Sequence, residues 1–94
     1  MKVVWSPTAD RNADAIWEYI AQDNIDAADA IAELVRAAAD RLRDYPLMGK
    51  EGRTPRSREI VVAGTPYILV YRVSKDRIEI ARVLHGRQDW PRKP

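Results

Sequence analysis

The single histidine of the chain, His85, lies between two arginines, Arg82 and Arg87. An imidazole titrates near neutral pH and can act as a general acid or base. A guanidinium group can stabilise the negative charge that develops on a phosphorane. These residue types could therefore cleave RNA without a metal, although a lone histidine at the end of a strand can equally fill a structural role.

Strand alternation separates the groups of this possible site. If residues 77–85 form a regular strand, His85 shares a face with Arg77, Glu79, Ala81 and Val83. Arg82 then lies on the other face, with Ile80 and Leu84. The pattern indicates that His85 and Arg82 are poorly placed to cooperate.

Basic residues are concentrated in the second half of the chain. Residues 1–47 hold five basic and nine acidic residues, whereas residues 48–94 hold eleven basic and five acidic residues. Such a surface attracts an anionic partner, and planar guanidinium groups bind carboxylates or phosphates in a bidentate manner. We expect the surface that binds such a partner, whether nucleic acid or an acidic protein, to contain Arg53, Arg56, Arg58, Arg72, Arg82, Arg87 and Trp90.

The sequence lacks the residue patterns that several other chemistries require. The chain has no cysteine, no HExxH motif, no glycine-rich phosphate loop and no serine beside a plausible base. We therefore expect neither a metal nor a cofactor.

Tyr67 and Tyr71 share a face of one strand and could stack on bases, but such a pair more often belongs to the core. Trp5 and Trp17 are also expected to belong to the core.

The first half of the chain predicts a strand and two helices. Residues 2–5 form a short apolar run that ends at Ser6-Pro7, where Ser6 can cap a helix with Pro7 at its first position. Apolar residues at three- and four-residue spacing predict one helix to about Gln22 and a second helix ending at residues 44–46. Two helices with a short connection form an antiparallel hairpin.

The second half predicts an antiparallel meander. Residues 47–57 carry glycines and a proline without periodicity and are expected to form a loop. Residues 58–63, 67–74 and 77–85 are rich in β-branched residues, and the middle run is apolar on both faces. The fold class is therefore α+β, in the order β-α-α-β-β-β, with the helix hairpin packed on one face of an antiparallel sheet.

The length of 94 residues suits one domain. We expect residues 1–94 to form it, with a partly flexible tail at 88–94 that Trp90 alone could anchor. The start of the chain does not read as a signal peptide, and no apolar run is long enough to span a membrane. The cytoplasm is the expected compartment.

Two segments resemble the RelE/ParE toxin superfamily: residues 64–73 (GTPYILVYRV) and residues 80–90 (IARVLHGRQDW). The superfamily has an aromatic-rich strand followed by a last strand ending in a Leu-His-x-Arg-x-Asp-like signature. The resemblance extends over nearly the whole chain and implies the toxin of a type II toxin–antitoxin system, neutralised by a cognate antitoxin protein.

The resemblance implies two different activities on one fold. ParE-like members poison DNA gyrase without being enzymes, and residues 84–90 resemble this branch more closely. RelE-like members cut messenger RNA on the ribosome, and in that alternative the site would contain His85, Arg87 and Tyr71. However, Ile68 stands where nucleases of the family often have an arginine. A third alternative is an inactive member that acts as a binding module.

Overall fold

The structure is a computed structural model that describes residues 1–87. Within these residues, no helix is both long enough and apolar enough to cross a membrane. The two helices follow the first strand, and four strands follow the helices. The elements are β1 (Lys2–Trp5), α1 (Pro7–Ala21), α2 (Ile25–Arg41), β2 (Lys50–Glu51), β3 (Arg58–Val61), β4 (Tyr67–Val73) and β5 (Arg77–His85).

Both helices begin at capping residues that the sequence places there. The Ser6 hydroxyl accepts a hydrogen bond from the amide of Ala9, and the side chain of Asn24 accepts one from the amide of Ala27. Such caps satisfy backbone donors that the first helical turn leaves without partners. The capping confirms the predicted start at Ser6-Pro7, but α2 ends at Arg41, a few residues before the predicted limit at residues 44–46.

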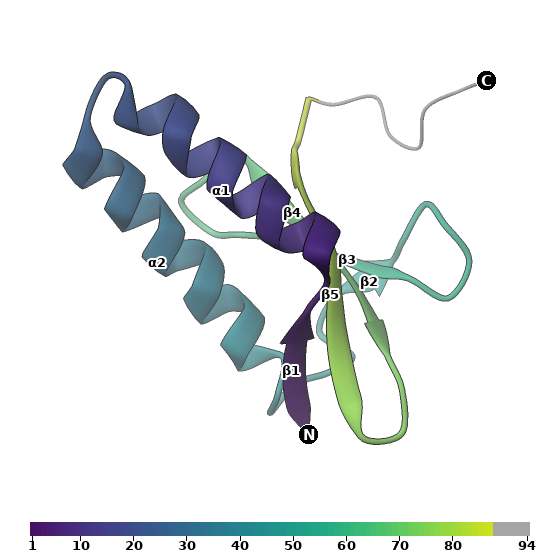
Figure 1. The fold of residues 1–94 in the computed structure, drawn as a ribbon. Helices are drawn as coiled ribbons and strands as arrows, with labels where there is room; N and C mark the ends of the chain where they lie inside the picture. Colours follow the sequence, from purple (N-terminus) through teal and green to yellow (C-terminus); the bar gives the residue numbers. More distant parts are fainter. Residues whose placement is uncertain (88–94) are drawn as a thin grey trace.

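The sheet has five strands in the order β1-β5-β4-β3-β2 (Figure 1). The predicted meander of β3, β4 and β5 is confirmed, and β5 has the predicted bounds 77–85. The sheet is not wholly antiparallel, however, because β1 pairs parallel to β5. A short β2 also lies within the segment expected to be a loop, where it pairs antiparallel with β3.

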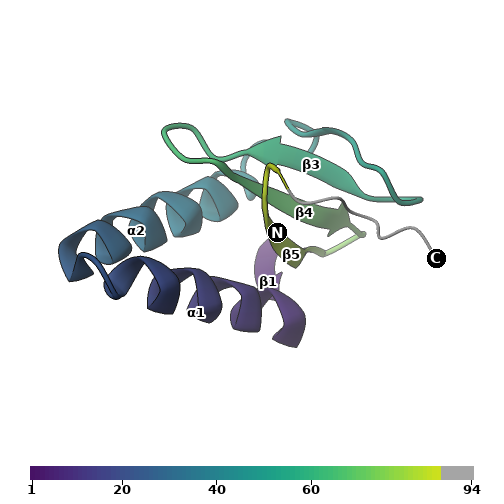
Figure 2. The same cartoon turned by 90° about the horizontal axis from the view of Figure 1, so that it is seen from above.

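The helix pair forms a layer on one face of the sheet, which we call the inner face (Figure 2). The core lies between the two layers and contains alternate residues of β4, namely Tyr67, Leu69 and Tyr71. Small side chains of the helices, such as Ala9 and Ala39, are fully buried against it. Small residues at these positions let the helices approach the sheet closely. The α+β class and its helix layer are thereby confirmed.

A β-bulge interrupts the pairing of β4 with β5. Tyr71 pairs with Ile80, but its neighbour Val70 pairs with Arg82, so Ala81 is an extra residue on β5. Such an insertion reverses the alternation of side chains beyond it. Ile80 therefore lies on the inner face with the core residue Val83. The prediction that Ile80 shares a face with Arg82 was wrong, because it assumed a regular strand.

Candidate functional site

The outer face of the sheet, turned away from the helices, carries a row of paired residues. Glu59 of β3 pairs with Val70 of β4, and Val70 pairs with Arg82 of β5. Directly paired residues project from the same face. In the next row, Arg72 pairs with Glu79, and their charged groups lie 4.0 Å apart. Two of the predicted arginines, Arg72 and Arg82, therefore lie together on the outer face.

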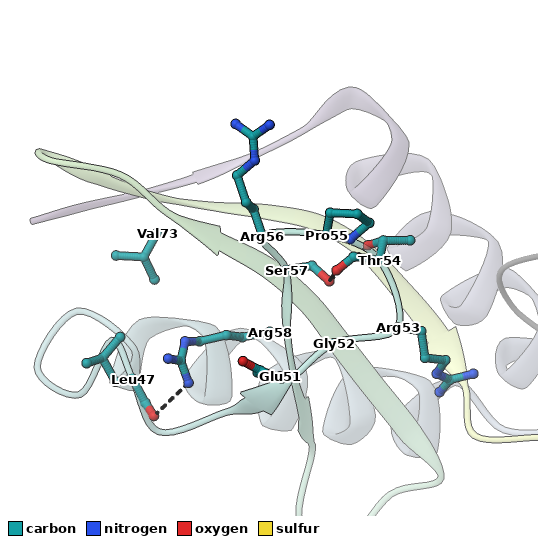
Figure 3. A pocket seen from close by; sticks show the side chains of 10 residues that line it. All are labelled: Leu47, Glu51, Gly52, Arg53, Thr54, Pro55, Arg56, Ser57, Arg58 and Val73. Carbon is teal, nitrogen blue, oxygen red and sulfur yellow. Dashed lines mark hydrogen bonds between the residues drawn. The ribbon is translucent and has the colours of Figure 1, made fainter.

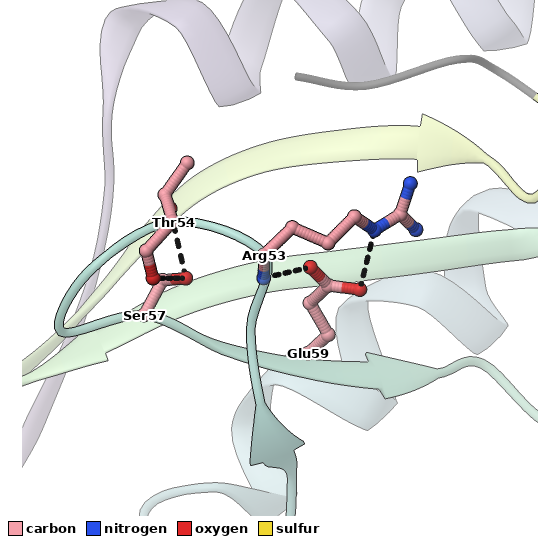
Figure 4. Close-up of polar contacts among 4 residues, drawn as sticks. All are labelled: Arg53, Thr54, Ser57 and Glu59. Carbon is pink, nitrogen blue, oxygen red and sulfur yellow. Dashed lines mark hydrogen bonds and ion pairs between the residues drawn. The ribbon is translucent and has the colours of Figure 1, made fainter.

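The loop between β2 and β3 brings a third arginine to this face. The backbone amide of Arg53 and its Nε atom donate hydrogen bonds of 2.9 and 3.2 Å to the two carboxylate oxygens of Glu59 (Figure 4). Glu59 is only 3% exposed. A buried carboxylate needs such partners, because an isolated buried charge is costly. Glu59 therefore fixes the loop and the cation of Arg53 relative to the strands.

Further hydrogen bonds make the same loop rigid. The amide of Gly52 donates to the carbonyl of Ser57 at 2.8 Å, and the hydroxyl of Thr54 donates to the hydroxyl of Ser57 at 2.9 Å. Ser57 is buried. Arg56, near the loop tip, has φ of 59°, a conformation that costs a residue with a side chain about 1–3 kcal/mol. The loop therefore presents Arg56 in a fixed and strained conformation.

Arg58 lies on the opposite face of the sheet from Arg72 and Arg82. It pairs with Tyr71, which places it on the inner face. Its Nη1 atom donates to the carbonyl of Gly49 at 2.7 Å. It also donates, more weakly, to the carbonyl of Leu47 at 3.4 Å (Figure 3). These bonds hold the backbone between α2 and β2. The guanidinium of Arg58 lines a groove at the edge of the sheet, together with Leu47 and Val73.

The residues of the alternative nuclease site are not brought together. His85 pairs with Tyr67, and their rings meet edge to face with centroids 5.6 Å apart. Tyr71 lies four positions farther along β4, roughly 13 Å away at the rise of a strand. Arg87 follows β5, is exposed, and donates its amide to Nδ1 of His85 at 3.1 Å. Trp90 lies outside the described residues.

Both core tyrosines are confirmed as core residues, at 7% exposure for Tyr67 and 0% for Tyr71. Burial raises the pKa of the Tyr67 phenol, with a smaller contribution from Tyr19. Trp5 is half-buried against the core. Trp17 is half-buried between the helices, where its indole N–H donates to Asp29 at 2.8 Å.

Sequence reasoning missed three residues that organise the site. Glu59 was not singled out, although it is the sole acidic residue of β3. Ser6 was identified only as a helix cap, and Asn12 was not considered. Both side chains bond to the backbone of β5 beside Arg82. The sequence does contain a signal for the bulge in β5, because the apolar residues Ile78, Ile80 and Val83 break strict alternation.

Comparisons with known proteins extend over nearly the whole chain. The family described as ParE toxin of type II toxin-antitoxin system, parDE, matches residues 3–90. The toxin candidate Y4kP of Sinorhizobium fredii is 41% identical over 90 residues, which cover 96% of this chain and 93% of that protein. Toxin RelE2 of Caulobacter vibrioides is 37% identical over 85 residues, which cover 90% of this chain and 94% of its own.

Two solved structures share the fold. A chain of the chromosomal ParDE toxin–antitoxin system from P. aeruginosa superimposes with a TM-score of 0.81 at 20% identity, over 90% of this chain and 95% of that chain. A YoeB/ParE toxin from Agrobacterium tumefaciens gives a TM-score of 0.63 at 17% identity, over 90% and 98% of the two chains.

Proposed function

The chain belongs to the ParE toxin family of type II toxin–antitoxin systems, and from this membership we propose that it arrests growth by poisoning DNA gyrase. The observation that carries the choice between activities is the separation of His85 from Tyr71. A general acid–base pair must lie within hydrogen-bond reach of one substrate. The outer-face arginines suit binding to a protein target, which needs no catalytic group.

The hydroxyl of Tyr71 supports the same choice. It donates to the carbonyl of Pro46 at 2.9 Å and accepts from the amide of Gly49 at 2.8 Å. A fully buried hydroxyl with both kinds of partner is suited to holding structure rather than to transferring protons. The ribosome-dependent messenger RNA nuclease remains the alternative that an experiment must address, and an inactive binding module is the other.

An antitoxin is the partner of a toxin in such a system. We infer that an extended or helical segment of the antitoxin lies across the helix pair and the sheet. Large apolar side chains are exposed on the helices: Tyr19 at 74%, Ile25 at 59% and Leu34 at 43%. Their burial would add to pairs between arginines and antitoxin carboxylates. The cytoplasm, where gyrase acts, is the compartment that this function requires.

The test is a supercoiling and DNA-cleavage assay with purified gyrase, with and without the antitoxin. The expected result is inhibited supercoiling and accumulated broken DNA, both reversed by the antitoxin. A primer-extension scan of translated messenger RNA is run in parallel. Intact gyrase activity together with codon-spaced RNA cuts would replace the proposal with the nuclease. Expression without growth arrest or either activity would identify a binding module.

A further inference from the structure

The N-cap residue Ser6 and Asn12 of α1 hold the backbone of β5 on both sides of Arg82. Strand β1 ends at Trp5, opposite Ile80, and the first turns of α1 lie against β5. The Ser6 hydroxyl donates to the carbonyl of Ala81 at 2.9 Å while it caps α1. The Asn12 side-chain oxygen accepts from the amide of Val83 at 3.1 Å. The bulge at Ala81 is thus fixed by specific contacts.

The bulge decides which way Arg82 points. Without the extra residue, the pairing of Tyr71 with Ile80 would continue so that Arg82 faced Leu69. Leu69 is fully buried in the core, where an arginine could not be accommodated without a charged partner. Bulges often redirect a side chain at a functional position. Here the bulge directs Arg82 to the outer face, beside Val70.

Arg82 opens onto a polar hollow between α1, the β2–β3 loop and the sheet. Hydroxyl-bearing residues Ser6, Thr8 and Thr54 line it, together with Arg72 and Glu79. The contact of 4.0 Å between Arg72 and Glu79 is at the limit of an ion pair, and both side chains are about half exposed. A carboxylate that enters the hollow can compete with such a weak pair.

We propose that this hollow binds a carboxylate of an acidic protein segment, with Arg72 and Arg82 as the binding residues. Ser6 and Asn12 are positioning residues, since they act through the backbone that carries Arg82. The inference requires only a protein partner, which membership of a toxin–antitoxin family supplies, and does not depend on gyrase as the target.

The hollow favours a protein segment over nucleic acid. Sites for single-stranded nucleic acid combine positive charge with aromatic rings on which bases stack. No aromatic residue lines this hollow among the described residues, and both core tyrosines face the helices instead. The carboxylate of Glu79, which lines the hollow, would repel a chain of phosphates. A single carboxylate between two arginines avoids most of that repulsion.

The test is a titration of the full chain with a short peptide of alternating glutamate and serine, followed by NMR of the arginine Nε–H groups. The Arg72 and Arg82 signals are expected to shift and saturate. Arg82→Gln should weaken binding about tenfold, as expected for loss of a charge-assisted hydrogen bond. Arg43→Gln, at an exposed arginine just after α2 that does not line the hollow, is the matched control and should bind as the wild type does.

The positioning role has its own pair of variants. Asn12→Ala removes the acceptor for Val83 and should weaken peptide binding, whereas Asn12→Asp keeps an acceptor and should restore it. Circular dichroism establishes that each variant is folded. If Asn12→Ala does not fold, Arg82→Gln still decides the binding role.

Three results would overturn the proposal: no saturable shift, equal loss in Arg82→Gln and Arg43→Gln, or tighter binding of a single-stranded oligonucleotide of equal charge. Failure of the gyrase assay with retained peptide binding would reject the proposed target and leave this site in place. Inhibition of gyrase without peptide binding would reject this site and leave the proposed target in place.

Discussion

The hydroxyl oxygen of Tyr71 lies 2.8 Å from the amide nitrogen of Gly49, in a buried contact between residues 22 positions apart in sequence. The same hydroxyl donates to the carbonyl of Pro46 at 2.9 Å. Backbone groups in a short connection lack the regular partners of a helix or a strand, and here one core side chain supplies a partner to two of them. The connection from α2 to β2 is held by the sheet that it leads to.

Tyr71→Phe should destabilise the fold while leaving toxicity intact. The ring stays in the core, but the amide of Gly49 and the carbonyl of Pro46 lose their partner, and each loss of this kind costs about 1–3 kcal/mol. Urea denaturation should show a lower free energy of unfolding with an unchanged slope. If RNA cutting disappeared while stability stayed at the wild-type value, Tyr71 would have a catalytic role instead.

Gly49→Ala should be strongly destabilising for a steric reason. A Cβ atom at position 49 would lie 2.7 Å from the Tyr71 hydroxyl and 2.8 Å from the carbonyl oxygen of Glu59. Backbone atoms cannot move aside as a flexible side-chain end can, so the segment must shift. The thermal midpoint should fall by more than for Tyr71→Phe. An unchanged midpoint would mean that this connection is not closely packed in solution.

The sequence was sufficient to predict β1, both helices and the β3–β5 meander in their order, because periodicity and capping are local signals, but it did not predict the two-residue strand β2. It could not predict that β1 pairs parallel to β5, since that contact joins the two ends of the fold. Nor could it reveal the hydrogen bonds of Tyr71. An apolar strand explains why Tyr71 is buried, but only the tertiary structure shows what its hydroxyl reaches.

When the protein is expressed without the antitoxin, Arg82→Glu should reduce toxicity while the protein remains folded, because a carboxylate on the outer face would repel an acidic surface of the target. Arg87→Glu, at an exposed position just after β5, should act in the same direction. Growth arrest after induced expression is the measurement, with Arg43→Glu as the control for a general change of charge. Full toxicity in both variants would exclude these two arginines from the surface that acts on the target.

Arg53 and Glu59 should show energetic coupling in a double-mutant cycle. Glu59 is buried, and two of its hydrogen bonds come from Arg53. Glu59→Gln and Arg53→Ala should each lower the free energy of unfolding, by about 1–3 kcal/mol for loss of a bond to a buried charged group. The double variant should lose less than the two losses added together. Simple additivity would show that the contact between the Arg53 Nε atom and the Glu59 carboxylate contributes nothing to stability.

Alkaline conditions should destabilise the fold in part through Tyr67. Burial, with a smaller effect of Tyr19, raises the pKa of this phenol in the folded state. The unfolded state therefore ionises first, near pH 10. The contribution of Tyr67 to the free energy of unfolding is fully present below that pH and is lost as pH rises through the folded-state pKa. Denaturation from pH 8 upward should show a smaller loss for Tyr67→Phe than for the wild type, with Tyr45→Phe as the exposed control.

The site was less predictable than the fold. Six arginines were chosen by residue type, and the structure brings Arg53, Arg72 and Arg82 to the outer face while turning Arg58 toward the backbone of Gly49. Composition cannot distinguish an arginine that holds a loop from one that meets a partner. The face of Arg82 depends on a single inserted residue, which shifts every later side chain of β5 by one position.

The parallel pairing of β1 with β5 has a consequence for biosynthesis. Ser6 bonds to Ala81, 75 residues later in the chain, and Lys2 pairs with Arg77. A ribosome releases the first strand and both helices well before the last strand, at roughly 5–20 residues per second. The nascent chain therefore cannot complete its sheet until β5 has been synthesised. Until then, Arg82 and the outer face that it helps to form do not exist for a partner to bind.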